Sequence, residues 1–190
     1  MIETIFLAFL IGKIKGYKIK PIFKTWQIYP PIFLEIICFI LQINIFRGNY
    51  HTIIYFKNIK TIYLMSYIFL ILKYKEYVQA IIGSVFIFIG SFLNKIAILK
   101  NNGKMPVFPT LSYKTGYATK EAFNIVKDIH ILGDENSSVI FLTDIFDLGY
   151  SVLSIGDILI RAYVFIIIYT SIKLESKKQE QDENSSLKVI

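Results

Sequence analysis

The chain has 190 residues, of which 54% are hydrophobic and 18% are charged, and its mean hydropathy is +0.53. A soluble domain needs a more polar surface, so this composition predicts an integral membrane protein. The net charge of +7 does not indicate a nucleic-acid-binding protein, because the lysines border long apolar runs. Positive charge in that position is typical of the cytoplasmic ends of membrane spans. We therefore expect the lipid bilayer as a partner and no nucleic acid.

Apolar runs divide the chain into a membrane domain, residues 1–173, and a polar tail, residues 174–190. We expect an all-α fold, an integral membrane bundle of about five transmembrane helices in the cell membrane. Residues 13–24 carry five lysines and no acid, which predicts a cytoplasmic loop. The N-terminus is then outside, and the tail is cytoplasmic and disordered. The predicted spans are residues 1–14, 30–46, 53–72, 78–99 and 154–172, with the limits of the first and third left open.

Small residues gather on one face of the predicted span 78–99. Side chains of this size allow neighbouring helices to approach closely. Asn94 lies near the outer end of this face and is expected to hydrogen-bond to a neighbouring helix. The small residues of the face are Ala80, Gly83, Ser84, Gly90 and Ser91.

Residues 100–150 form a polar insert between the last two spans. The insert carries five lysines and six acids, so it lacks a positive excess and is predicted to be extracytoplasmic. Thr119 is expected to cap a short helix that ends at His130. Residues 139–148 are too short and too acidic to span a bilayer, and whether they lie on the membrane or cover the bundle is left open. His130 is interpreted as an ordinary surface residue.

A serine and an aspartate begin the last predicted span. Ser154 and Asp157 have the spacing of an N-terminal capping box, with Asp in place of Glu. Arg161 follows Asp157 by four residues, where opposite charges on a helix meet. We expect Asp157 to be shared between Arg161 and the Asn94/Lys95 end of the preceding span, which would fix these two helices under the insert. The alternative is a proton or ion path, which would need polar groups from other helices, such as Glu35.

Two motifs carry a resemblance to a known family. The first is NNGKMPVFP, residues 101–109, directly after a span, and the second is SIGDILI, residues 154–160, at the start of the last one. Together they resemble an uncharacterised bacterial family of small multi-spanning membrane proteins, common in clostridia and their relatives and known only as a domain of unknown function. The resemblance implies a membrane topology and no mechanism, and Arg161 lies outside its pattern. Its family-type positions are Asn102, Gly103, Met105, Pro106, Val107, Ser154, Gly156 and Asp157.

The first motif also has a physical interpretation of its own. Asn102 and Gly103 permit a tight turn, and Pro106 holds the following segment extended. We expect residues 105–108 to pack back over the bundle near Asp157. The two motifs would then form one site in the outer leaflet, either a structural clasp or the rim of a small-molecule pocket.

Catalytic and cofactor motifs are missing from the sequence, which contains no Walker loop, HExxH, CxxC or dinucleotide fingerprint. We therefore expect no enzyme, no cofactor and no metal site. The predicted function is that of a structural or accessory membrane component, whose partner is another membrane protein or a second copy. The alternative is a membrane subunit that binds or transports a small solute. The candidate cluster comprises Asn94, Lys95, Asn102, Gly103, Met105, Pro106, Val107, Ser154, Gly156, Asp157 and Arg161.

Overall fold

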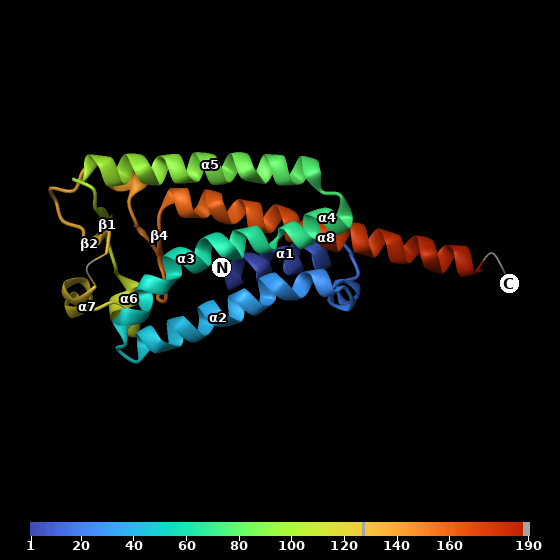
Figure 1. The fold of residues 1–190 in the computed structure, drawn as a ribbon, viewed down its shortest axis with the longest axis horizontal. Coiled ribbons are helices and arrows are strands. Elements are labelled where there is room, and N and C mark those ends of the chain that lie inside the picture. The colour runs from blue at the N-terminus through green and yellow to red at the C-terminus, as the bar shows by residue number, and fades with distance from the viewer. Residues whose placement is uncertain (127, 188–190) are drawn as a thin grey trace. The chain divides into compact units, whose positions relative to one another are not determined.

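The computed structural model describes residues 1–126 and 128–187, and most of them are helical (Figure 1). The α-helices are α1 (Ile2–Ile14), α2 (Tyr29–Phe46), α3 (Ile53–Ser66), α4 (Ile68–Tyr74), α5 (Tyr77–Lys100), α6 (Leu111–Thr115), α7 (Lys120–Ile125) and α8 (Ile155–Leu187). Short 3-10 helices cover Lys20–Lys24, Trp26–Ile28, Tyr50–Thr52 and Ile140–Leu142. The strands are β1 (Met105–Val107), β2 (His130–Leu132), β3 (Phe146–Asp147) and β4 (Val152–Leu153).

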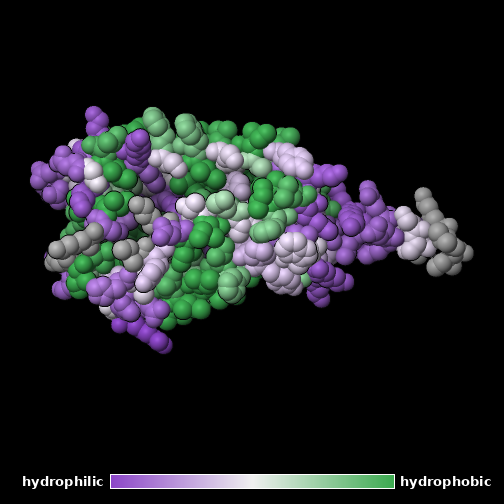
Figure 2. All heavy atoms as spheres, viewed as in Figure 1, coloured by the Kyte–Doolittle hydropathy of each residue, from purple (hydrophilic) through white to green (hydrophobic). Residues whose placement is uncertain are grey.

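Three helical segments of the described chain are long and apolar enough to cross a membrane. They are Trp26–Phe46 with 21 residues, Tyr77–Lys100 with 24 and Ile155–Ser186 with 32. Figure 2 shows apolar side chains gathered along α5, whereas hydrophilic side chains cover the C-terminal part of α8. The protein is therefore mostly helical with three candidate spans, and the expected count of five is not confirmed.

The two remaining predicted spans correspond to shorter helices. α1 has 13 residues, and the predicted span 53–72 is divided into α3, with 14 residues, and α4, with 7. At the division, the Ser66 hydroxyl donates to the Tyr63 carbonyl oxygen at 2.6 Å. The hydroxyls of Tyr63 and Tyr67 are hydrogen-bonded to each other at 2.7 Å. These local bonds satisfy buried polar groups at the point where one long helix was expected.

The chain divides into two compact units, and unit 1 comprises residues Met1–Glu35, Thr61–Val85 and the chain from Arg161 onward. Its buried apolar side chains include Leu70, Val164 and Ile168. Gly83 of α5 lies against Tyr163 of α8, where a Cβ atom at position 83 would clash with the tyrosine ring. The small-residue face predicted for this helix therefore does permit a close helix contact at Gly83.

The tail predicted to be disordered is helical as far as Leu187 in α8. Contacts within unit 1 explain the difference. The backbone N–H of Lys18 donates to Ser176 Oγ at 2.9 Å, and the Lys18 ammonium forms an ion pair with Glu183 at 2.6 Å. Tyr74 donates to Glu175 at 3.0 Å. The composition of residues 174–187 predicted a solvated chain, but bonds to distant residues hold this segment as a helix.

Unit 2 comprises residues Ile36–Lys60 and Phe86–Ile160 and contains the insert. β1 pairs in parallel with β2, with Met105 opposite His130, and the two strands lie side by side in Figure 1. β3 and β4 form an antiparallel pair. Ala97, Met105 and Leu142 form a buried apolar cluster that joins the end of α5 to the insert.

Short strands and an early helix end correct two expectations for the insert. Thr119 caps α7 as predicted, since its hydroxyl accepts the Ala122 N–H at 3.2 Å. The helix ends at Ile125, however, and not at His130, which lies in β2. The strands have only two or three residues, too few to give an alternating pattern in the sequence, so an all-α fold was expected.

Candidate functional site

Ser154 and Asp157 form the predicted cap at the start of α8. The backbone N–H of Asp157 donates to Ser154 Oγ at 3.0 Å. In a capping box the acidic side chain accepts the backbone N–H of the cap residue, but here the Asp157 carboxylate lies 3.2 Å from the Ser154 hydroxyl. The structure therefore confirms one of the two hydrogen bonds of the predicted capping box, the one that the Ser154 hydroxyl accepts.

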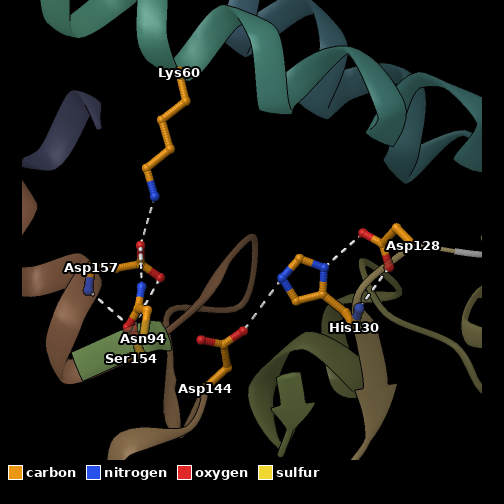
Figure 3. Close-up of polar contacts among 7 residues, drawn as sticks. All are labelled: Lys60, Asn94, Asp128, His130, Asp144, Ser154 and Asp157. Carbon is orange, nitrogen blue, oxygen red and sulfur yellow. Dashed lines mark hydrogen bonds and ion pairs between the residues drawn. The ribbon is translucent and has the colours of Figure 1, made fainter. Parts of the chain in front are cut away.

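Two further elements bring polar groups to Asp157 (Figure 3). Lys60 of α3 forms an ion pair with its Oδ1 at 2.7 Å, and the Asn94 amide of α5 donates to the same atom at 3.5 Å. The Ser154 hydroxyl also lies 2.8 Å from Asn94 Oδ1. We call these four residues, Lys60, Asn94, Ser154 and Asp157, the Asp157 clasp. It connects α3, α5 and α8 within unit 2.

Glycines allow the close approach of α5 and α8 beside the Asp157 clasp. A Cβ atom at Gly90 would clash with the Gly156 carbonyl oxygen, and one at Gly156 would clash with the Asn94 side chain. Only glycine therefore fits at both positions without a movement of the backbone.

His130 lies between two acidic residues next to the Asp157 clasp. Its Nδ1 is 2.7 Å from Asp128 Oδ2, and its backbone N–H donates to Asp128 Oδ1 at 2.8 Å. Its Nε2 points to Asp144 Oδ2, 3.7 Å away (Figure 3). Asp128 thus fixes the orientation of the ring and keeps a proton on Nδ1. We call Asp128, His130 and Asp144 the histidine row.

Burial and neighbouring charges shift the pKa values of the histidine row. Burial raises the pKa of Asp144 to about 7, opposed by the positive charges of His130 and Lys60 and reinforced by Asp157. For His130, burial favours the neutral ring, but the contacts with Asp128 and Asp144 outweigh it and raise the pKa. Burial also favours the neutral form of Asp128, but hydrogen bonds from His130 hold its pKa below the usual range. The row therefore contains one acid with a pKa of about 7 and one histidine whose charged form is favoured.

Strand β1 carries the first motif next to the histidine row. The N–H of Asp144 donates to the Pro106 carbonyl at 3.1 Å, and the N–H of Phe108 donates to the Asp144 carbonyl at 2.8 Å. Asn102 and Gly103 form the expected turn, with φ of 54° and 81°. Residues 105–108 therefore lie beside Asp144, whose pKa the Asp157 carboxylate raises.

The predicted cluster is brought together only in part. Asn94, Ser154, Gly156 and Asp157 meet at one point, and Met105 and Val107 are buried in β1. Lys95 is exposed on α5. The ion pair of Arg161 is with Glu3 of unit 1, and that of Asp157 is with Lys60, so the predicted pairing of Asp157 with Arg161 is wrong. The i+4 spacing on the helix allows Asp157 and Arg161 to form an ion pair. Each of them instead forms an ion pair with a residue of another helix.

Four residues of this region were missed as site residues: Lys60, Asp128, His130 and Asp144. The spacing of Asp128 and His130 is a usable signal, because residues i and i+2 of an extended segment share one side. Nothing in the sequence connects Asp144 or Lys60 to them, since both contacts depend on tertiary structure. Among residues 1–126 and 128–187 no group of three or more acidic, His or Cys side chains is arranged to hold a metal ion.

One of three comparisons with known proteins gives a match, and it is to an uncharacterised family. No curated protein and no solved structure matches the chain. One family matches residues 19–169, most of the chain, and its description is "Family of unknown function (DUF5317)". The chain belongs to this family, DUF5317.

Proposed function

We propose that the protein is a structural or accessory component of the cell membrane, in which the Asp157 clasp joins α5 and α8, the two helices that flank the insert, to each other and to α3. One observation carries the proposal: a lysine from α3 and an asparagine from α5 meet the carboxylate that begins α8. An insert fixed in this way presents a defined surface to a membrane-protein partner or a second copy.

The internal bonds of the Asp157 clasp support a structural role. The ion pair from Lys60 and the contacts to Ser154 and Asn94 already engage both carboxylate oxygens of Asp157. A ligand would have to replace these bonds, which is costly for buried polar groups. The buried side chain of Ser154, with 0% of its surface exposed, indicates the same role.

Native mass spectrometry tests this function on protein extracted gently from its own membrane at native expression. We expect the wild-type chain to retain a defined protein partner or a second copy at a fixed stoichiometry. The variant Asp157→Asn should lose much of that complex. The control Asp182→Asn makes the same change at an exposed position of α8 and should keep the complex. A wild-type chain that is monomeric and without a partner would contradict the proposal.

A second candidate function, transport of a small solute or ion, is favoured by ionisable side chains in the apolar helices. Glu35 lies in the candidate span Trp26–Phe46 and is 8% exposed. Arg161 of α8 forms an ion pair with Glu3. Ionisable groups at such positions often line substrate or ion paths. Ion flux in proteoliposomes that Glu35→Gln abolishes would favour this candidate, and equal flux in protein-free liposomes would exclude it.

A further inference from the structure

A buried acid next to the Asp157 clasp lacks a hydrogen-bond donor. Asp144 is 4% exposed, and its Oδ1 has no hydrogen-bond partner among the described residues. Its other oxygen is 3.7 Å from His130 Nε2, which is longer than a hydrogen bond. An ionised carboxylate in this position is strongly disfavoured. A bound proton removes this charge.

His130 offers a route for that proton. Its side chain is 41% exposed, whereas the Asp144 side chain is 6% exposed. Asp128 holds the ring so that Nε2 points to Asp144 (Figure 3). Solvent therefore reaches the imidazole, and the imidazole faces the acid that solvent does not reach.

The charges around Asp144 come from three elements besides its own segment. β2 and the turn before it supply His130 and Asp128, α8 supplies Asp157, and α3 supplies Lys60. Lys104 donates to the Asp128 carbonyl at 2.9 Å. Three carboxylates thus face two lysines and one histidine, so one additional proton makes the group neutral when His130 is uncharged.

We infer that His130 and Asp144 form a proton-binding site on the insert, in which His130 takes a proton from solvent at Nε2 and passes it to Asp144 Oδ2. The transfer breaks the Nε2–H bond and forms the O–H bond of the acid. It leaves a neutral imidazole whose Nδ1–H still donates to Asp128 Oδ2. The two heavy atoms must approach from 3.7 Å to hydrogen-bond distance for the transfer.

Proton loss from this site weakens the neighbouring Asp157 clasp. An ionised Asp144 repels the Asp157 carboxylate and competes for Lys60. The site thus adds a ligand, the proton, to the structural role proposed above and does not depend on the identity of any partner protein.

The direction of the pH effect follows from linkage. Burial raises the pKa of Asp144 to about 7, well above that of an unfolded aspartate. The folded chain therefore binds a proton that the unfolded chain has already released, and Asp144 makes stability decrease as pH rises from about 4 to 7. His130, whose pKa is also raised, loses its stabilising contribution as pH rises through its folded pKa.

Infrared difference spectroscopy of the full-length chain in lipid nanodiscs tests the site directly. We expect the carbonyl band of a protonated carboxylic acid at about pH 5 and its loss by about pH 9. Asp144→Asn should lower the intensity of the band, to which Glu76, a second buried acid whose pKa burial raises to about 8, also contributes. The control Glu135→Gln, at an exposed position of the same insert, should leave the intensity unchanged. His130→Gln should move the midpoint to higher pH, because the imidazolium no longer favours the carboxylate.

Protease resistance of the insert gives a second readout on the same variants. Wild type should be cleaved faster at about pH 8 than at about pH 5.5. This difference should be smaller in Asp144→Asn, which mimics the neutral acid and keeps only the contribution of His130. A band whose intensity is the same in Asp144→Asn as in wild type, or that does not change over this pH range, would overturn the inference. A native partner complex that remains intact in Asp144→Asn leaves the proposed function standing whatever the infrared result.

Discussion

At the scale of the residue, Asp147 shows how one carboxylate orders a loop. It accepts the backbone N–H groups of Thr110 at 2.6 Å, Ser112 at 2.8 Å and Gly149 at 2.7 Å. The Ser112 hydroxyl also donates to it at 2.5 Å. Burial favours the neutral acid, but these bonds outweigh it and hold the pKa below the usual range.

We predict that Asp147→Asn makes the insert more sensitive to protease. An amide has one acceptor oxygen where the carboxylate has two, so some of the backbone N–H groups that Asp147 accepts lose their partner. We expect the free energy of unfolding of the insert to fall by about 1–3 kcal/mol. The lowered pKa of Asp147 means that wild type should lose this stabilisation as pH falls through the folded pKa. Glu135→Gln is the control, and equal cleavage of both variants would contradict the prediction.

Part of the residue-scale detail was predictable from the sequence. The spacing of Ser154 and Asp157 identified the cap and the central carboxylate correctly, because capping depends on neighbours in the chain. The partner of Asp157 was not predictable, because Lys60 reaches it from a distant helix. Asp144 was not predictable as a site residue either, because its burial and its contact with His130 arise only when the insert folds.

At the scale of the element, the contact between α5 and α8 depends on glycine. Gly90 and Gly156 bring the two backbones together, and Asn94 lies beside them. The small residues of α5 predicted a close helix contact, and the structure has it at the glycines, whereas Ser84 and Ser91 of the predicted face are exposed. The extension of α8 to Leu187 was missed, because its bonds to Lys18 and Tyr74 are not visible in a local pattern.

Gly90→Ala should lower the thermal stability of the detergent-solubilised chain. The added methyl group has no room next to the Gly156 carbonyl oxygen, so the helices must separate, at a cost of about 1–3 kcal/mol. Ser91→Ala, at the next and exposed position of α5, should leave the melting temperature nearly unchanged. A shift of equal size in both variants would argue against a specific helix contact.

At the scale of the whole molecule, hydrophobicity predicted a membrane protein with about five spans. Three helices of the described chain are long and apolar enough to be candidate spans. Mean hydropathy and apolar runs identified the three long helices, since lipid exposure acts on every residue of a span. The division between α3 and α4, next to the local bonds of Tyr63 and Ser66, has no counterpart in a hydropathy pattern. The family match over residues 19–169 agrees with the resemblance but supplies no activity.

Cysteine labelling of intact cells tests the proposed orientation. If α8 crosses the membrane, the insert before it and the tail after it lie on opposite sides. We expect Ser137→Cys in the insert to react with an impermeant maleimide and Ser185→Cys in the tail to react only after lysis. Wild type, whose single cysteine is Cys38 in α2, is the control for background labelling. Labelling of both positions in intact cells would contradict this orientation.

The most direct test of the account is a double-mutant cycle on the Asp157 clasp. Lys60→Met, Asp157→Asn and the double variant are compared with wild type by thermal unfolding in nanodiscs, with Lys95→Met as the control for loss of an exposed charge. Because the ion pair at 2.7 Å joins α3 to α8, we predict a coupling free energy of about 0.5–2 kcal/mol between the two substitutions. Additive effects of Lys60→Met and Asp157→Asn would contradict the clasp.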